Sequence, residues 1–338
     1  MSAIEEVGSQ APAVEAVPKR AMTLSSGTAF VVVLLLLVVP LFVKNFIIFQ
    51  MTMLLIYGLA VLALNILTGG SGQFSLGQSA FYAVGAYTSA ILMEQYNINY
   101  ALTLPVAGVV CFGFGFLFGQ PALRLSGVYL ALATFALATA MPQILKLGFF
   151  EHWTGGVQGL VVTKPDAPFG LPMSQDMWLY YFTLAITIAI YIFSVNLLRS
   201  RSGRAFMAIR DNEIAASAMG IDVATYKTLA FGVSAGITGV AGGLGAIAVQ
   251  FVAPDSYTIV LAISLFLGMV VGVVGWLPGS FIGAAFIIFV PNIAEGISKG
   301  LSGAVFGVLL FLIIFLVPHG ARQVAMVAQQ LLSKVRKT

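Results

Sequence analysis

The feature that most constrains this chain is a succession of long apolar stretches that carry almost no charge. Read in windows of about 20 residues, the length that crosses a bilayer as an α-helix, the sequence predicts ten membrane spans. They cover residues 28–43, 46–67, 74–93, 100–119, 127–147, 177–198, 228–252, 257–275, 279–294 and 301–317. Glycine, proline, serine and glutamine interrupt the two spans that begin at 74 and 279, so these two are candidates for broken or re-entrant segments.

The composition excludes a water-soluble domain. Only 8% of the 338 residues are charged and 59% are hydrophobic, whereas an ordinary soluble domain carries about 25% charged residues. No series of short segments alternates apolar and polar residues, which argues against an outer-membrane barrel. We therefore predict an all-α polytopic membrane protein of about ten transmembrane helices, some of them discontinuous.

The distribution of lysine and arginine predicts the orientation, because these residues concentrate on the cytoplasmic side. With the N-terminus inside, 12 of the 16 lie on the cytoplasmic side and 4 outside, so we expect both termini in the cytoplasm. A transmembrane domain, 28–318, then lies between a disordered tail, 1–27, and a basic tail, 319–338. Segment 148–176 faces outward and is expected to hold a short surface helix, whereas segment 199–227 faces the cytoplasm.

The predicted spans contain almost no ionisable side chain, and Glu94 and Lys146 lie at span edges. Charged groups inside a bilayer are costly and commonly mark proton relays. A proton-driven pump is therefore not indicated. Sodium coupling through backbone carbonyls at broken helices needs no buried charge and stays open.

Three glycine-rich stretches interrupt the apolar pattern. Residues 65–78 add uncharged donors and acceptors, and two interpretations have equal weight: polar ties between packed helices, or the lining of a translocation path. On the second, the candidate pathway residues are Asn65, Ser71, Gln73, Ser75, Gln78, Tyr82 and Thr134. Residues 232–245 carry glycines at helical spacing, which favours tight helix packing. Residues 272–280 resemble 72–79, which is consistent with an internal repeat.

Catalysis and metal binding find little support. Residues 69–72 spell Gly-Gly-Ser-Gly, as in intramembrane serine proteases, but His152 and His319 lie outside the spans and leave the serine without a base. Two histidines and one cysteine make no plausible metal site, and no phosphate-binding loop occurs. A net charge of +4 does not imply nucleic acid. We predict a chain that is not an enzyme and binds no metal or cofactor.

The cytoplasmic segment predicts a short helix. Asp211 or Asn212 is a good N-cap, Glu213 suits the positive end of the helix dipole, and Gly220 can end a helix in the left-handed conformation. One interpretation is a solvated amphipathic helix. The other is a slim, alanine-rich helix that enters a groove on another protein.

A resemblance favours the second interpretation. The segment resembles the permeases of branched-chain amino acid ABC importers, nearest to the Liv-type M subunit, in the run Ser202-Gly-Arg-Ala…Ala208-Ile-Arg-Asp-Asn-Glu-Ile-Ala-Ala…Met-Gly-Ile. Motifs at 65–88, 123–131, 154–160 and 251–256 fit the same family. The resemblance implies a coupling helix that sits in a cleft of a cytoplasmic ATPase. The residues that it assigns to this coupling are Gly203, Arg204, Arg210, Asp211, Glu213, Ala215, Ala216 and Gly220.

The same resemblance implies a multi-subunit importer in a bacterial cytoplasmic (inner) membrane. Its partners would be a homologous second permease, two cytoplasmic ATPases that use ATP and Mg, and a periplasmic solute-binding protein. Family relatives carry leucine, isoleucine and valine, whereas others carry urea, amides or aromatic acids, and the sequence does not choose among them. The alternative is a stand-alone ion-coupled secondary transporter or channel for a small neutral solute such as urea or an amide.

Overall fold

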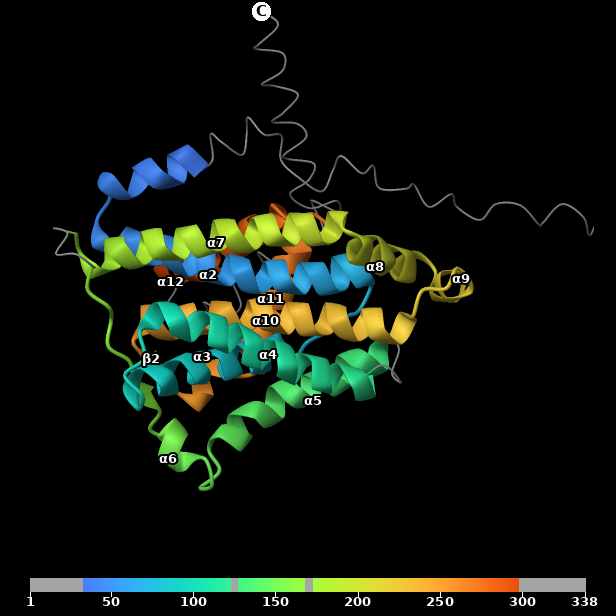
Figure 1. Ribbon diagram of the computed structural model, residues 1–338. Helices are drawn as coiled ribbons and strands as arrows, with labels where there is room; N and C mark the ends of the chain where they lie inside the picture. The colour runs from blue at the N-terminus through green and yellow to red at the C-terminus, as the bar shows by residue number, and fades with distance from the viewer. Residues whose placement is uncertain (1–32, 123–126, 168–172, 298–338) are drawn as a thin grey trace, which may run out of the picture.

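The computed structural model describes residues 33–122, 127–167 and 173–297 (Figure 1). The predicted tails, 1–27 and 319–338, and the predicted span 301–317 lie outside the described residues. The long helices are α2 (Asn45–Asn65), α3 (Gln78–Glu94), α4 (Tyr100–Ala122), α5 (Val128–Leu145), α7 (Gln175–Arg199), α10 (Val223–Val249), α11 (Ile259–Gly272) and α12 (Gly279–Ile297). Short elements are η2 (Val39–Leu41), η3 (Ile66–Gly70), α6 (Glu151–Thr154), β1 (Leu160–Val161), α8 (Arg201–Asp211), α9 (Glu213–Ala218), β2 (Phe251–Val252) and η5 (Pro254–Tyr257).

Among the residues that the structure describes, six helical segments are long and apolar enough to cross a membrane, which makes the chain a mostly helical, multi-pass membrane protein. They are Asn45–Gly70, Tyr100–Pro121, Val128–Leu145, Gln175–Arg199, Val223–Val249 and Pro254–Gly272. Each corresponds to one of the ten predicted spans within a few residues. Helices α3 and α12 occupy two further predicted spans, but α3 has only 17 residues, and the apolar part of α12 is also short. The full count of ten stays a prediction.

Helix α10 forms the centre of the molecule. The most apolar window of α10 is 83% buried, whereas the corresponding windows of α4, α5 and α7 are each 28% buried. Small residues allow this close packing: Gly236 faces the Gly108 carbonyl of α4, and Gly242 lies against the backbone of α3 at Tyr82. The prediction of tight helix packing over residues 232–245 is therefore confirmed.

The polar stretch after α2 breaks the helix. Helix α2 runs into a π-helical turn, η3, and the chain then continues without helix until α3 begins at Gln78. The span predicted to begin at 74 therefore begins as helix at 78, because residues 74–77 belong to the break. Gly72, at φ 74°, takes the left-handed conformation within the break.

A second break separates α11 from α12. Helix α11 ends at Gly272, and Val273 and Gly275 follow with φ of 76° and 85°. The two helices then pack antiparallel, with the Gly268 carbonyl facing Gly283 and Gly272 facing Gly279 so closely that no side chain fits. The two breaks that the sequence related to each other thus have the same position in two helix pairs. One lies between α2 and α3, and the other between α11 and α12.

The short elements gather at opposite ends of the bundle (Figure 1). Helices α8 and α9 form one end, hereafter the α9 end, and the Ser200 side chain caps α8 by accepting a hydrogen bond from the Gly203 amide. At the other end, hereafter the α6 end, α6 and β1 follow α5, and β1 pairs antiparallel with β2. Helix α6 is the short helix predicted within residues 148–176.

Candidate functional site

The Asn65 side chain connects the two breaks. Its Nδ2 donates to the Trp276 carbonyl at 3.1 Å and to Ser280 Oγ at 3.2 Å, and its Oδ1 accepts from the Gly275 amide at 2.6 Å. The residue is 1% exposed. Since non-helical backbone inside a membrane must find partners within the protein, this amide satisfies polar groups that the second break would otherwise leave unpaired.

The Gln78 side chain makes a second buried network at the start of α3. Its Nε2 donates to Ser234 Oγ and its Oε1 accepts from Thr238 Oγ1, both at 2.8 Å. Ser234 in turn donates to the Ala63 carbonyl at 2.8 Å. Three helices, α2, α3 and α10, are thereby joined through side chains that the apolar core surrounds.

The other polar residues of the break also have partners. Gln73 Nε2 donates to Ser71 Oγ at 2.9 Å and to the Lys227 carbonyl at 3.1 Å. Ser75 Oγ accepts from the Gly77 amide at 3.2 Å, and Thr134 Oγ1 accepts from the Leu76 amide at 2.9 Å. These contacts are what the interpretation as polar ties between packed helices expects, and the role in a pathway stays a prediction.

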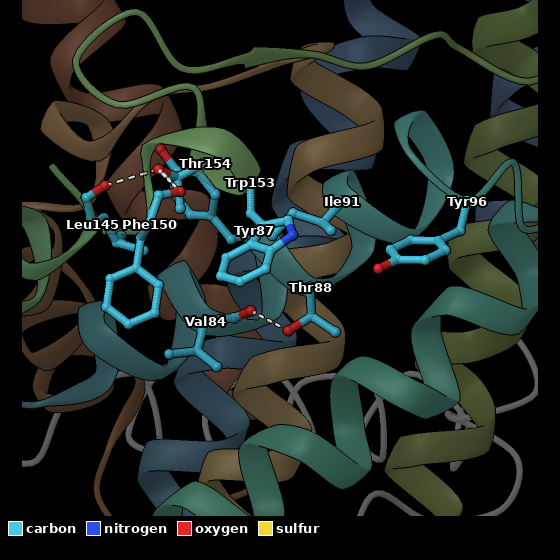
Figure 2. Close-up of a pocket in the computed structure, with 9 residues that line it drawn as sticks. All are labelled: Val84, Tyr87, Thr88, Ile91, Tyr96, Leu145, Phe150, Trp153 and Thr154. Atoms are coloured by element: carbon cyan, nitrogen blue, oxygen red, sulfur yellow. Dashed lines mark hydrogen bonds between the residues drawn. The ribbon is translucent and has the colours of Figure 1, made fainter. Parts of the chain in front are cut away.

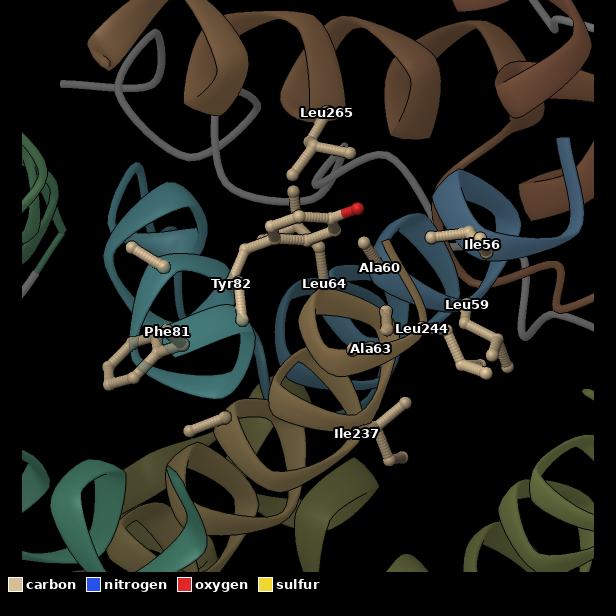
Figure 3. Packing of buried hydrophobic residues seen from close by; sticks show 14 of the residues in the cluster. Ile56, Leu59, Ala60, Ala63, Leu64, Phe81, Tyr82, Ile237, Leu244 and Leu265 are labelled. Carbon is tan, nitrogen blue, oxygen red and sulfur yellow. The ribbon is translucent and has the colours of Figure 1, made fainter. Parts of the chain in front are cut away.

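Tyr82 belongs to a row of four tyrosine rings that the sequence did not suggest. Its ring lies 6.3 Å from that of Tyr57 on α2 and 5.8 Å from that of Tyr257 on η5, which lies 6.2 Å from the Tyr87 ring. Figure 3 shows Tyr82 reaching from α3 toward Leu265 of α11. The row leads from the buried core toward the α6 end, where η5 follows β2.

A pocket of about 360 Å³ opens at the α6 end, hereafter the outer pocket (Figure 2). One wall is α3, and the opposite wall is the end of α5 with α6. Most of its lining is apolar or aromatic, with Val84, Tyr87, Thr88 and Ile91 from α3, Tyr96 beyond it, and Leu145, Phe150, Trp153 and Thr154 from the opposite wall. The Thr88 and Thr154 hydroxyls donate to the carbonyls of Val84 and Leu145 at 2.7 and 2.9 Å. The sequence did not indicate this pocket because its walls come from three separate helices.

At the α9 end, the residues assigned to coupling lie on α8, α9 and the turns around them. Asn212 caps α9 by accepting from the Ala215 amide at 3.0 Å, and Gly220 follows the helix with φ 80°. Ile214 and Met219 are 82% and 83% exposed, so α9 presents apolar side chains outward. Asn212, rather than Asp211, is therefore the N-cap.

The remaining residues of this group fix the two short helices to the bundle. Glu213 forms an ion pair with Lys227 of α10 at 2.6 Å, and Arg210 donates to the Gly69 carbonyl at 2.7 Å as well as to Asp211. Gly203 lies directly against the carbonyls of Leu197 and Leu198, and Ala216 is buried. Arg204 donates to the Arg199 carbonyl at 3.1 Å. The α9 end is thus tied to the first break through Arg210.

Comparison with known families decides what kind of protein carries these features. The family described as the branched-chain amino acid transport system / permease component matches residues 46–317, most of the chain. The chain belongs to this permease family. The match includes both breaks, the outer pocket and the α9 end.

Individual relatives agree. The chain is 36% identical over 246 residues to the high-affinity branched-chain amino acid transport system permease protein LivM of Salmonella typhimurium, covering 64% of this chain and 57% of that protein. It is 35% identical over 270 residues to LivM of Escherichia coli, covering 71% and 63%. It is also 29% identical over 262 residues to the autoinducer 2 import system permease protein LsrC of Escherichia coli O157:H7, covering 75% and 72%. The chain thus spans about 57–63% of the length of the two LivM relatives. No solved structure matches.

Proposed function

We propose that this chain is the transmembrane permease subunit of an ATP-driven ABC importer for branched-chain or related hydrophobic amino acids. The observation that carries the proposal is the family match over residues 46–317. The names of the two LivM relatives supply the substrate class. Uncharged hydrogen-bonding residues in the breaks suit a neutral or zwitterionic solute, because they offer partners without a net charge.

Helix α9 is the proposed coupling helix, the element that docks on an ATPase. Its exposed Ile214 and Met219 supply apolar contact, which buried interface positions favour. Two connections would carry its movement to the break after α2. Arg210 binds the Gly69 carbonyl directly, and Lys227, the ion-pair partner of Glu213, accepts from Gln73 through its carbonyl.

The proposed topology has ten spans, with the α9 end and both termini in the cytoplasm and the α6 end in the periplasm, across a bacterial inner membrane. The charge distribution supports it, because 12 of 16 lysines and arginines fall on the cytoplasmic side in this arrangement. The α9 end carries five of them between residues 199 and 227.

The proposed assembly joins the chain to a homologous second permease, two cytoplasmic ATPases and a periplasmic solute-binding protein. ATP and Mg are bound by the ATPases. This chain then needs neither a catalytic centre nor a cofactor, because the energy enters through α9.

The test is a charge reversal on α9. Glu213→Lys places a positive charge on the docking helix α9, beside Lys227 of α10. We therefore expect ATPase co-purification to fall about tenfold or more, equivalent to about 1.4 kcal/mol. The variant should still be present in the membrane. The control is Glu151→Lys, the same change on exposed α6 at the opposite end. Unchanged co-purification and uptake in Glu213→Lys would count against coupling through α9.

A second measurement separates the importer from a stand-alone carrier. The purified chain alone in liposomes should move no leucine under a sodium or proton gradient, whereas the complete complex should take it up when ATP is supplied. Uptake by the chain alone would contradict the proposal.

A further inference from the structure

The outer pocket contains a polar group without a partner. The Tyr87 side chain is 3% exposed and lines the pocket, and within the described part of the chain its hydroxyl makes no hydrogen bond. A buried hydroxyl without a partner is unfavourable, and such groups in native structures call for an explanation. The neighbouring hydroxyls of Thr88 and Thr154 are already engaged, whereas the Tyr87 hydroxyl has its hydrogen-bonding capacity left for a ligand.

An ion pair joins two residues that are close in sequence to the pocket lining and to the tyrosine row. Lys146 follows Leu145, a lining residue, and pairs with Asp255 of η5 at 2.5 Å. The Asp255 side chain is 66% exposed, and Asp255 lies two residues before Tyr257, whose ring is 6.2 Å from that of Tyr87. One positive and one negative group therefore stand together next to an apolar pocket.

We infer that the outer pocket binds the transported amino acid before it passes through the membrane. The apolar side chain of the amino acid lies against Val84, Ile91 and Trp153. Its carboxylate faces Lys146, its ammonium faces Asp255, and the Tyr87 hydroxyl bonds to this charged head. The inference rests on the proposed function and adds to it a site that selects a zwitterion with an apolar side chain.

The size and lining of the pocket fit this ligand. Small-molecule sites range over roughly 300–1,000 Å³ and combine apolar walls with a few placed polar groups. At about 360 Å³ the outer pocket is at the small end, which suits a single amino acid rather than a peptide. The rings of Tyr87 and Trp153 also present faces that attract an ammonium group.

The row of tyrosines gives the pocket a connection to the interior. Tyr87 packs against Tyr257, and Tyr257 against Tyr82, which reaches the core between α2 and α10. An amino acid held at Tyr87 is therefore next to rings that continue inward, with the first break of α2 and α3 beyond them.

The experiment uses the complete permease–ATPase complex in nanodiscs, without the solute-binding protein. L-leucine is titrated against the fluorescence of Trp153, one of only three tryptophans in the chain, and Trp153→Phe identifies its signal. We expect saturable quenching by L-leucine and at least about tenfold weaker binding of leucinamide, which lacks the carboxylate, since hydrogen bonds to charged groups contribute strongly.

Two variants test the pocket, each with a matched control. Tyr87→Phe removes the hydroxyl and should weaken L-leucine binding about tenfold. Tyr191→Phe, on α7, removes another buried hydroxyl that has no partner among the described residues, and it should change nothing. Val84→Trp fills the pocket and should abolish binding, whereas Val109→Trp, at a 72% exposed position on α4, should leave it intact.

The outcomes separate the two proposals. ATP-driven leucine uptake by the complete transporter that is unchanged in Tyr87→Phe and Val84→Trp would overturn the pocket and leave the proposed function standing. A complex that hydrolyses ATP yet takes up no branched-chain amino acid would overturn the proposed function, and the pocket with it. Lys146→Gln should weaken L-leucine binding, whereas Lys44→Gln, which removes a positive charge at an exposed position before α2, should not.

Discussion

At the scale of single residues, Asn65 shows how one amide can hold an irregular membrane protein together. It bonds to Gly275, Trp276 and Ser280, about 210 positions further along the chain. The segment after α11 lacks the internal hydrogen bonds of a helix, and lipid offers none. Asn65 replaces them, so the two breaks depend on each other.

Asn65→Leu should therefore destabilise the protein. The substitution leaves the Gly275 amide without its partner and removes one hydrogen bond from the Trp276 carbonyl, which keeps the one from the Gly279 amide. We expect a loss of about 1–3 kcal/mol. The measurement is unfolding in detergent with increasing SDS. Thr139→Val is the control, because the exposed Thr139 hydroxyl bonds only within its own helix, to Phe135 and Ala136. Equal stability of the two variants would show that Asn65 is not a structural tie.

Asp222 predicts a pH dependence at the start of α10. Hydrogen bonds from the Thr225 hydroxyl, at 2.6 Å, and from the Thr225 amide hold the pKa of this carboxyl below its usual value. Because the pKa is lower in the folded protein, the Asp222 cap stabilises the helix fully at pH values above the unfolded pKa, about 3.9. This stabilisation is lost as the pH falls through the lower folded pKa.

The first turn of α10 should accordingly open in acid. We expect amide hydrogen exchange at residues 223–226, corrected for intrinsic rates, to lose protection below about pH 4. Asp222→Asn cannot titrate, so its protection at these amides should not change over the same range. The same acid response in both proteins would exclude Asp222 as its source.

At the scale of elements, the position of α10 depends on glycines that let helices touch through their backbones. Gly85 of α3 faces the Gly239 backbone so closely that any side chain would collide with it. Gly85→Leu should therefore separate α3 from α10 at a cost of about 3 kcal/mol, since backbone yields less than a flexible side chain. We expect a lower thermal midpoint and a lower level in the membrane.

Gly113 on α4 provides the matched control for this prediction. A Cβ at Gly113 meets nothing within 4 Å, so Gly113→Leu makes the same chemical change in open space. Its thermal midpoint should stay close to that of the parent protein. Similar losses in the two variants would mean that leucine in a helix, rather than the contact with Gly239, is responsible.

The apolar pattern predicted most elements because the long helices coincide with long apolar stretches of the sequence. Glycine spacing predicted the packed face of α10. Capping residues predicted the helix after Asn212, because a cap is specified by a few neighbouring positions. The sequence did not predict α8, because residues 201–211 lack an apolar run. It also did not predict that α3 begins only at Gln78. The partners of Asn65 and the outer pocket were beyond it, since they join elements that are distant in the sequence.

At the scale of the whole molecule, the candidate sites follow one another along the bundle from the α6 end to the α9 end. The outer pocket is at the α6 end, the tyrosine row leads inward from it, and the breaks tied by Asn65 lie beyond. Arg210 then joins the first break to α8 at the α9 end. A movement of α8 and α9 would therefore reach the interior through backbone that is already interrupted, where displacement disturbs the fewest helical hydrogen bonds.

This arrangement requires the two ends to face opposite compartments, and the single cysteine makes a direct test possible. Cys111 is fully buried, and its thiol donates to the Phe81 carbonyl at 3.4 Å. The parent protein should therefore not be labelled by a membrane-impermeant maleimide. In intact cells whose outer membrane has been permeabilised, Glu151→Cys on α6 should label, whereas Ser217→Cys on α9 should not. Inside-out vesicles should reverse this result, because the cytoplasmic face is then outward. Labelling of both positions from the same side would contradict the proposed topology, and with it the transfer of energy from α9 to a pocket on the opposite face.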